Sequence, residues 1–311
     1  MKKRTLSFSN PAYLSLKDNQ LVIRLPEVEN NDTLPDSFKQ NAVRTIPVED
    51  IGVVLLDNKR ITITQGLLEA LLENNCAVIT CDNRSMPCGL MLPLEGHTIQ
   101  QERFTQQIEV SLPLRKQLWQ QTVVRKIENQ AAVLRKYVGC ETGNMDKWAA
   151  AVRSGDADNM EARAAAYYWA NIFPDIPDFT RRRDGAYPNN WLNYGYAILR
   201  ATVARALVSA GLLPTLGIHH HNRYNAYCLA DDIMEPYRPF VDERIKQMMK
   251  DMPDEKEISK EVKAALLTIP VMDVMIDGNS GVLMVAVSKT VASLQKCYSG
   301  ELRNLIYPMM K

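Results

Sequence analysis

The stretch GLLPTLGIHHHNRYNAYCLADDIMEPYRPF, from Gly211 to Phe240, is the part of the chain around which the rest is organised. It contains three of the four histidines of the protein, His219–His221. Pro214 and Gly217 precede them, and prolines and glycines in such a segment predict a turn. We therefore expect the three imidazoles on a loop where the chain changes direction.

The LADDIME segment that follows predicts a helix, which we expect to end at Pro236. Asp232 and Glu235 are three residues apart, so on a helix they share a face. A histidine brought onto that face would make a mixed nitrogen and oxygen site, which suits Mg²⁺, Mn²⁺ or Zn²⁺ better than a metal that prefers thiolates. The alternative interpretation is a polar loop before an amphipathic helix whose acidic groups lie in water.

Composition limits the classes of protein to consider. With 311 residues and 46% hydrophobic content, the chain is long enough for one large domain or two ordinary ones. We find no apolar run that would span a membrane and no apolar signal core after the basic N-terminus, so we expect a cytoplasmic protein. The net charge of +1 is not that of a general nucleic-acid binder, although a basic excess in residues 98–240 permits DNA binding. The six cysteines form no CxxC pair and are expected to be reduced thiols.

Residues 1–96 predict a β-rich N-terminal domain. Short runs rich in Val, Ile, Leu and Thr, among them RTLSFS, QLVIRL and IGVVLL, are separated by turn residues. Residues 65–74, QGLLEALLEN, have the apolar period of one helix. Residues 26–42 are acidic and polar with two prolines, and we expect a long loop there. We find no catalytic constellation in this domain and expect it to form a homodimer surface.

Residues 97–311 predict a larger all-α catalytic domain, so the expected fold class is α+β. Apolar residues recur at helical spacing along residues 101–139, where Pro113 should break or kink the first part. Residues 155–159 predict a break and an N-cap before the next strong helix. Further helices are predicted at residues 145–154, 160–173, 188–210, 243–249, 258–267 and 281–295.

Two charged features of the helical part have two interpretations each. Glu161 lies in the first turn of its helix, where the helix dipole favours a carboxylate, and this is a sufficient structural reason for it. Arg181, Arg182 and Arg183 are adjacent in a loop that is explained equally by a solvated turn. Next to a metal site, the same three arginines would hold phosphates by charge-assisted hydrogen bonds.

Three motifs together resemble a known family. Glu161–Tyr168, EARAAAYY, is similar to EGxAAxxY, with an alanine in place of the usual glycine. Asn189–Tyr196, NNWLNYGY, is similar to NALLSYGY, and the stretch from Gly211 resembles GLxPxxGFLHxxRYxxxSLALDLMExFRP. These are motifs of the CRISPR-associated integrase, the metal-dependent nuclease of CRISPR adaptation modules, in a form like that of type II systems. The resemblance covers nearly the whole chain, and it too implies a β domain before a helical one.

The resemblance implies a set of site residues. In the long motif His220 takes the position of the histidine, Asp232 that of the aspartate and Glu235 that of the glutamate. Glu161 opens the first motif. Glu161, His220 and Glu235 are thereby implied to be catalytic residues and metal ligands, with Asp232 as a nearby supporting acid.

The sequence departs from the family pattern at a few positions. His219 and His221 flank the motif histidine, which leaves open which imidazole binds, although the spacing favours the middle one. Cys228 stands at a serine position and Asp231 at an apolar one.

The resemblance also implies a chemistry and its partners. With Mg²⁺ or Mn²⁺, the 3′-hydroxyl of a short DNA fragment, the prespacer, would attack a phosphodiester at the leader–repeat junction of a CRISPR array. Partners would be double-stranded DNA, a second copy of the chain, a small ferredoxin-like adaptation protein in a heterohexamer, and the type II effector nuclease. The arginines expected to hold DNA phosphates are Arg163, Arg181, Arg182, Arg183 and Arg223.

Two other functions fit the same residues less well. The first is a zinc-dependent hydrolase of a small substrate, with the histidines and the following acids as ligands, although HExxH and a cysteine pair are missing. The second is a non-catalytic scaffold that binds DNA ends or partner proteins. Preference for Mg²⁺ or Mn²⁺ over Zn²⁺, and loss of function on removing Glu235, distinguish the integrase from both.

Overall fold

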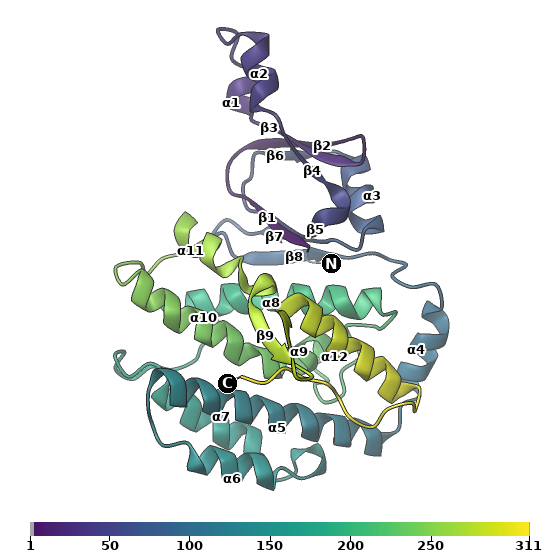
Figure 1. Ribbon diagram of the computed structural model, residues 1–311, viewed down its shortest axis with the longest axis vertical. Coiled ribbons are helices and arrows are strands. Elements are labelled where there is room, and N and C mark those ends of the chain that lie inside the picture. Colours follow the sequence, from purple (N-terminus) through teal and green to yellow (C-terminus); the bar gives the residue numbers. More distant parts are fainter. Residues whose placement is uncertain (1–2, 311) are drawn as a thin grey trace. The chain divides into compact units, whose positions relative to one another are not determined.

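A computed structural model describes residues 3–310 of the chain (Figure 1). The chain divides into two compact units, one up to Leu94 and one from Glu95 onward. The first is rich in strands and the second is mainly helical, which confirms the expected α+β class. In residues 3–310, no helix is both long and apolar enough to cross a membrane.

The first unit is built from two four-stranded sheets. Across one sheet the strands are β1 (Arg4–Phe8), β5 (Ile51–Leu56), β7 (Ala77–Cys81) and β8 (Pro87–Met91). Across the other they are β4 (Arg44–Pro47), β3 (Gln20–Arg24), β2 (Ala12–Lys17) and β6 (Ile61–Ile63). The strands β1, β5 and β7 are parallel to one another, and β2 is parallel to β6; the other pairs are antiparallel. A single-turn helix, η1 (Val48–Asp50), precedes β5.

Strand β2 alternates buried and partly exposed side chains, whereas β5, which lies between β1 and β7, buries five residues in succession. Leu14 of β2 and Ile51 of β5 are at most 1% exposed and belong to one apolar cluster. Helix α3 (Gln65–Glu73) packs against β2 and β7 and adds Leu67 and Leu71, one turn apart and fully buried, to the same cluster. The helix predicted at residues 65–74 is thus confirmed.

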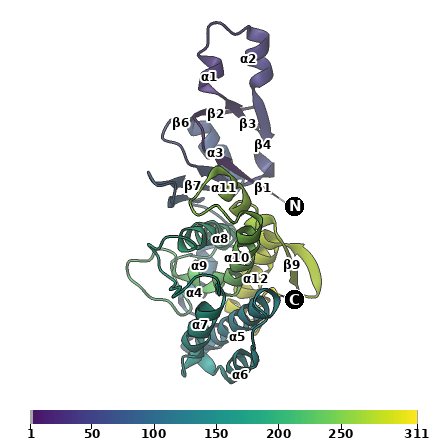
Figure 2. The ribbon, with the colours of Figure 1, turned by 90° about the vertical axis from the view of Figure 1, so that its left-hand side faces the viewer.

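The expectation of a long loop at residues 26–42 is wrong. Two short helices occupy it, α1 (Pro26–Glu29) and α2 (Asp36–Ala42), as Figure 2 shows beyond β3 and β4. Neither helix contains a buried residue. A helix without a buried face does not need apolar residues at helical spacing. That spacing is the sequence signal by which a helix is predicted, so these two helices were not expected.

The second unit is an assembly of helices. In chain order these are α4 (Gln100–Ile108), α5 (Leu112–Tyr137), α6 (Gly143–Ala151), α7 (Met160–Asn171), α8 (Asn189–Ser209), α9 (Cys228–Met234), α10 (Arg238–Asp251), α11 (Lys260–Leu266) and α12 (Leu283–Tyr298). Single-turn helices are η2 (Ser154–Asp156), η3 (Glu235–Tyr237) and η4 (Ile269–Val271). Helix α5 packs against α6, α7 and α10, while α8 packs against α9, α10 and α12.

The break predicted near Pro113 is confirmed. Helix α4 ends at Ile108, and α5 begins at Leu112 with Pro113 in its first turn, where a missing N–H costs nothing. The hydroxyl of Ser111 caps α5 by accepting a hydrogen bond from the amide of Leu114 at 3.4 Å.

The expected helix end just before Pro236 is confirmed. Helix α9 ends at Met234, and η3 carries the chain directly into α10 at Arg238. Pro236 and Pro239 each lie in the first turn of the helix that contains them. A proline is tolerated there, so the chain continues from α9 through η3 into α10.

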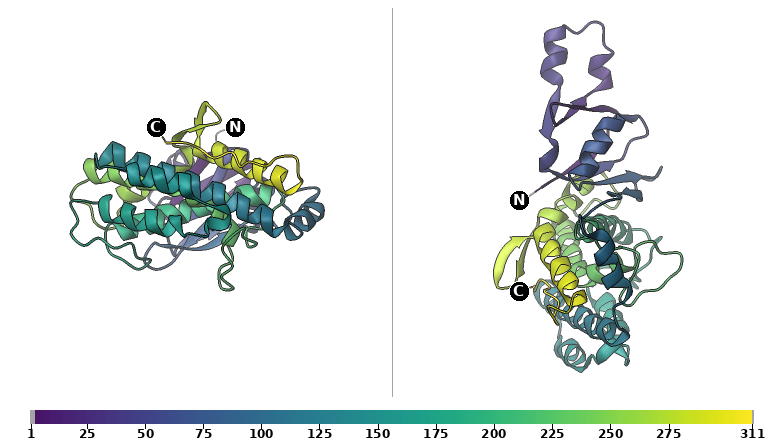
Figure 3. Two further views of the ribbon diagram at one scale, coloured as in Figure 1. Left: turned by 90° about the horizontal axis from the view of Figure 1, so that it is seen from below. Right: turned by 90° about the vertical axis from the view of Figure 1, so that its right-hand side faces the viewer.

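A β-hairpin interrupts the helical unit where none was expected. Strands β9 (Asp273–Ile276) and β10 (Asn279–Val282) pair antiparallel beside α12 (Figure 3), so α12 begins later than the predicted residue 281. Asp277 and Gly278 link the strands with φ of 52° and 72°. An Asp-Gly pair with positive φ at both positions is a strong hairpin signal.

A buried carboxylate links three of the helices and predicts an effect of pH on stability. The hydroxyls of Tyr168 and Tyr196 donate to Asp242 at 2.8 and 2.5 Å. Burial raises the pKa of Asp242 to about 6, although these hydrogen bonds and the nearby guanidinium groups of Arg181 and Arg238 act in the opposite direction. The folded protein therefore binds this proton more tightly than the unfolded chain does.

We expect this carboxyl group to stabilise the fold below about pH 4 and to lose that contribution as the pH rises through about 6, by roughly 3 kcal/mol in all. In Asp242→Asn, the free energy of unfolding should change less than in the wild type over that range. Urea unfolding between pH 4 and 7 measures it, with the exposed Asp146→Asn as a control that should follow the wild type. Parallel curves for wild type and Asp242→Asn would contradict the assignment.

Candidate active site

Glu161 is positioned by the start of α7. The carboxylate of Asp156 accepts hydrogen bonds from the amides of Met160 and Glu161 at 2.8 and 3.0 Å, which caps the helix. The side chain of Glu161 then extends toward α5, where its Oε1 lies 2.6 Å from Nζ of Lys126. Its side chain is 22% exposed, so this edge of the site is open to solvent.

Glu235 lies at the junction of α9 and α10 and is almost fully buried. Its Oε1 accepts a hydrogen bond from Nε of Arg238 at 2.8 Å, and its Oε2 lies 2.6 Å from Nζ of Lys126. Burial alone would raise the pKa of Glu235, but Arg238 and Lys126 lower it to about 2. The carboxylate is therefore ionised throughout the neutral range.

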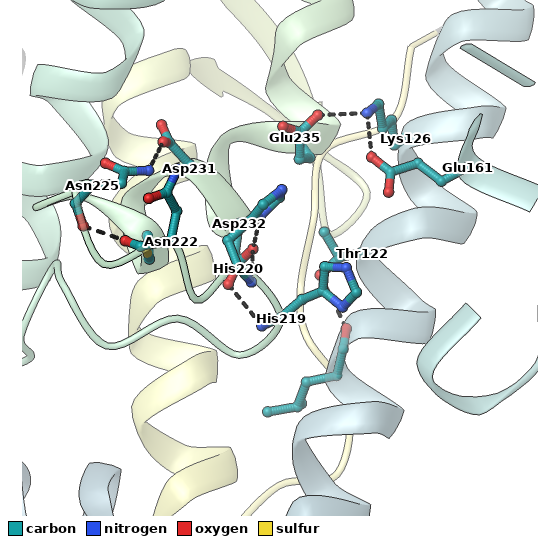
Figure 4. A network of polar contacts seen from close by, with 12 residues as sticks. Thr122, Lys126, Glu161, His219, His220, Asn222, Asn225, Asp231, Asp232 and Glu235 are labelled. Atoms are coloured by element: carbon teal, nitrogen blue, oxygen red, sulfur yellow. Dashed lines mark hydrogen bonds and ion pairs between the residues drawn. The ribbon is translucent and has the colours of Figure 1, made fainter. Parts of the chain in front are cut away.

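Lys126 of α5 connects the two carboxylates, as Figure 4 shows. Burial by itself would lower the pKa of its ammonium group, but Glu235 and Glu161 raise it above the usual value. The side chain is 11% exposed. Two acids from separate helices thus converge on one buried positive charge.

Asp232 holds the histidine loop in place. Its fully buried carboxylate accepts hydrogen bonds from the amides of His219 and His220 at 2.9 and 3.2 Å. Its Oδ1 also lies 2.5 Å from Nδ1 of His220. This hydrogen bond raises the pKa of His220 and leaves the other ring nitrogen, Nε2, for a further partner.

The three histidines have different surroundings. The ring of His219 is stacked on Trp119 with centroids 4.1 Å apart and planes parallel within 1°. The ring of His220 meets the edge of Trp119 and has the hydrogen bond to Asp232. His221 is exposed. The hydrogen bond from its ring to Asp232 distinguishes His220 from its two neighbours.

The arrangement can be tested for fit to a divalent cation. In residues 3–310, no three histidine, cysteine, aspartate or glutamate side chains lie close enough together to hold an ion as they stand. Yet Lys126 already places a positive charge between Glu161 and Glu235. Oε2 of Glu235 is buried and forms an ion pair with the ammonium group of Lys126. The geometry of this pair is not that of a hydrogen bond. Two carboxylates and a nearby imidazole are donors of the kind that Mg²⁺ and Mn²⁺ accept, so the residues fit such an ion.

The neighbouring acid, Asp231, has a separate role in the structure. Its carboxylate accepts two hydrogen bonds from Arg200, at 2.7 and 3.1 Å, and one from Asn225 at 2.7 Å. It therefore ties α9 to α8 and to the histidine loop. This explains why a charged residue can occupy a buried position where the family pattern has an apolar one.

The five arginines considered for DNA binding lie in two kinds of surroundings. Arg163, Arg182, Arg183 and Arg223 are exposed. Arg181 turns inward, where it donates to the side chains of Asn189 and Asn193 at 3.1 and 2.7 Å and lies over the ring of Tyr196. Its guanidinium group thus has partners within the fold, whereas the other four face solvent.

A hollow of about 370 Å³ lies beside the histidine loop. His220, Arg115 and Arg223 are among the residues that line it, together with the apolar side chains of Ile108 and Leu216. The positive charge of Arg115 and Arg223 beside the histidine loop suits a polyanion.

The contribution of α5 was missed from the sequence. Trp119, Thr122, Lys126 and Asn129 recur at spacings of three and four and so share one face of the helix. The amide of Asn129 donates to the carbonyls of Pro236, next to Glu235, and of Pro308 at 2.8 and 3.2 Å. Polar residues that interrupt an apolar helical face were the available signal.

Gly217 gives the site a test by substitution. A Cβ atom at this position would lie 2.4 Å from the carbonyl oxygen of His220 and 2.8 Å from Oδ2 of Asp232. We expect Gly217→Ala to displace the loop and to weaken Mn²⁺ binding by about 10- to 100-fold, the usual cost of disturbing the groups that orient a ligand. Gly143→Ala is the matched control, since a Cβ atom there meets nothing within 4 Å. Titration with Mn²⁺ measures both, and equal affinities would contradict the role given to this glycine.

Comparison with known families and proteins gives consistent matches. Residues 6–276 match the family model of CRISPR associated protein Cas1. The chain is 36% identical over 301 residues to the CRISPR-associated endonuclease Cas1 of Neisseria meningitidis serogroup C (strain 8013). The matched region covers 95% of this chain and 92% of the relative.

Solved structures share the fold. A casposase bound to an integration product is similar with a TM-score of 0.76 and 19% identity, over 98% of this chain and 92% of the other. A chain of a Cas6-RT-Cas1–Cas2 complex is similar with a TM-score of 0.74 and 18% identity, over 100% of this chain and 36% of the other.

Proposed function

Because the chain belongs to the Cas1 family of CRISPR-associated proteins, we propose that it is a metal-dependent DNA integrase that inserts short fragments into a CRISPR array. The observation that carries this proposal is the convergence of Glu161 and Glu235 on one buried positive charge, beside a histidine oriented by Asp232. The similarity to a casposase bound to its integration product agrees with it.

The ligands of the proposed Mg²⁺ or Mn²⁺ are Glu161, Glu235 and His220. Asp232 orients His220 through Nδ1, so that Nε2 is the nitrogen offered to the ion. Arg238 holds the second oxygen of Glu235 and keeps this carboxylate ionised. When bound, the ion polarises the phosphoryl group and stabilises the negative charge that develops in the transition state.

The proposed reaction is a transesterification. The 3′-hydroxyl of the fragment forms a new bond to phosphorus, and the bond from phosphorus to the 3′-oxygen of the target strand breaks. The proton lost by the attacking hydroxyl balances the one gained by the leaving hydroxyl. One phosphodiester replaces another, so no external energy source is required.

The proposed partners follow from the family. Double-stranded DNA, as fragment and as repeat, would lie along the exposed arginines and the hollow beside His220. One structural relative is a complex with Cas2. We propose a partner of that kind, small and ferredoxin-like, in a heterohexamer with two homodimers whose contact is formed by the β-rich unit. The type II effector nuclease remains a further proposed partner.

Joining of a labelled duplex to a supercoiled plasmid tests the function. We expect a fluorescent duplex with 3′-hydroxyl ends to become attached in Mg²⁺ or Mn²⁺, and not in EDTA. A duplex with dideoxy ends, which lacks the attacking group, is the matched control and should not join. Joining that persists in EDTA, or turnover of a small ester with Zn²⁺ in its place, would contradict the proposal.

Two arginines of the same loop should respond differently to substitution. Arg183 is exposed, so Arg183→Ala should lower the dependence of DNA affinity on salt by about one unit in a plot of log K against log salt concentration. Arg181→Ala should instead lower the midpoint of thermal unfolding, because it leaves the side-chain oxygen of Asn193 without its donor and that of Asn189 with only the amide of Arg182. Fluorescence anisotropy at several salt concentrations measures the first effect. An unchanged slope for Arg183→Ala would remove it from the DNA surface.

A further inference from the structure

Lys126 occupies the place where the two glutamates need a cation. Its ammonium lies 2.6 Å from Oε1 of Glu161 and 2.6 Å from Oε2 of Glu235, as the dashed lines in Figure 4 show. Together with Arg238, the group contains two positive and two negative charges, and is therefore neutral as a whole. The four charges thus already balance one another.

A divalent ion and this ammonium group compete for the same oxygens. An ion bonded to Oε1 of Glu161 and to Oε2 of Glu235 would lie within a few ångströms of Nζ, since that atom contacts both oxygens. Two cations so close together, with little water between them, repel each other strongly. The ammonium must therefore leave before the ion can bind both carboxylates.

The side chain of Lys126 is suited to such a movement. A lysine carries a compact charge on a flexible four-carbon stem, whereas the planar fork of an arginine is held by fixed geometry. The edge of the site at Glu161 is partly open to solvent, since that side chain is 22% exposed. An expelled ammonium there would find its next partner in a DNA phosphate.

We propose that Lys126 is a displaceable internal cation, which holds Glu161 and Glu235 together without metal and transfers to a DNA phosphate when the divalent ion binds. This inference depends on the proposed function, because it takes the two glutamates as metal ligands and DNA as the substrate. Its consequence is coupling: DNA gives the expelled ammonium a partner, so DNA strengthens metal binding, and metal strengthens DNA binding by the same factor.

The alternative is that Lys126 is a permanent structural bridge. In that case the ammonium stays between the carboxylates, and its removal only leaves two buried acids to repel each other. The two possibilities differ in the sign of one effect. A displaceable cation opposes the metal, so its removal tightens metal binding, whereas a permanent bridge supports the site, so its removal loosens it.

Titration of the full-length protein with Mn²⁺, with and without a short duplex, decides between them. For the wild type, we expect DNA to tighten Mn²⁺ binding by about tenfold, within the usual range of coupling between sites. For Lys126→Met, we expect Mn²⁺ to bind about tenfold more tightly than to the wild type when DNA is absent, and DNA to add little. Lys126→Gln retains a hydrogen-bond donor without the charge, and we expect the same tighter Mn²⁺ binding from it. It replaces Lys126→Met in the experiment if that variant folds poorly.

Lys136→Met is the matched control, since Lys136 also lies on α5 and pairs with a glutamate, Glu243, at 2.7 Å. It should bind Mn²⁺ as the wild type does. Tighter binding by both Lys126 variants, with loss of the DNA effect, supports the inference. Equal or weaker binding by both, in a wild type that does bind Mn²⁺ and joins DNA, overturns the inference alone. A wild type that binds no Mn²⁺ with or without DNA overturns the metal site and the inference with it.

Discussion

Glu235→Gln is expected to lower the rate of strand transfer by about 10³-fold or more at saturating Mn²⁺. The change keeps the shape of the side chain but removes the charge on which Lys126 and Arg238 converge. Catalysis by a bound ion supplies several kcal/mol of transition-state stabilisation, and about 4 kcal/mol corresponds to that factor in rate. Single-turnover joining of a labelled duplex to plasmid measures it.

Glu243→Gln is the matched control for this substitution. Glu243 is also a glutamate of the α10 region that pairs with a lysine of α5, Lys136, but it lies outside the site. We expect its strand transfer to stay close to that of the wild type. Because Glu235→Gln also leaves the buried Arg238 without a charged partner, it should lower the free energy of unfolding by roughly 3 kcal/mol. Its fold therefore has to be checked by circular dichroism at the assay temperature.

Glu161→Gln should resemble Glu235→Gln, and the double variant should be little worse than either. Residues that hold one ion act as a unit, so their effects on the rate are not additive. A double variant that multiplies the two losses would show that the glutamates act separately. Strand transfer by Glu235→Gln at the rate of the wild type would leave only the scaffold function, since DNA binding alone does not require this charge.

His220→Ala carries the second large effect and answers which of the three histidines binds. Only His220 among them has its Nδ1 on Asp232, which directs Nε2 elsewhere. We expect His220→Ala to lose at least about 10²-fold in strand transfer, as removal of a ligand should cost no less than disturbance of the group that orients it. The rate of joining at several Mn²⁺ concentrations measures the loss, and excess Mn²⁺ should restore part of it.

The neighbouring histidines provide the controls. His221 is exposed, so His221→Ala should remain near the wild-type rate. His219→Ala removes the ring stacked on Trp119 and should lower the midpoint of thermal unfolding more than it lowers the rate. A loss confined to His221→Ala or His219→Ala would mean that the motif spacing identifies the wrong imidazole.

The part of the site that lies within one short stretch could be predicted from the sequence. Asp232 and Glu235 were expected on one helix face beside the three histidines, because all five residues are near neighbours in the chain, and the resemblance selected His220. Glu161 was added by the resemblance of its motif, because no local pattern connects it with the others. The structure shows the connection, which is the ammonium of Lys126.

Lys126 could not be predicted in the same way. It lies 35 residues before Glu161 in the chain, and the packing of α5 against α7 and η3 alone brings it to the carboxylates. A lysine on a long amphipathic helix ordinarily indicates a solvated face. Only its position in register with Trp119 and Asn129, both buried, distinguishes it from the exposed lysines of the same helix, Lys116 and Lys136.

In the fold, too, some elements could be predicted from the sequence and others could not. The strands of the first unit follow from short runs rich in Val, Ile, Leu and Thr, and its helix α3 from the apolar period, because these residues form a buried core. Helices α1 and α2 bury nothing and left no such pattern. The β9–β10 hairpin did leave one, since Asp277-Gly278 is a strong turn signal, but a helical interpretation of the surrounding residues concealed it.

The central claim is that Glu161, Glu235 and His220 bind one divalent ion together, and anomalous scattering from crystals grown with Mn²⁺ tests it most directly. Data collected at the manganese absorption edge locate the ion without reference to activity. We expect a peak within bonding distance of a carboxylate oxygen of each glutamate and of Nε2 of His220, with the ammonium of Lys126 moved away from both carboxylates. A protein that retains the ammonium between the two glutamates, with manganese bound elsewhere or not at all, would contradict it.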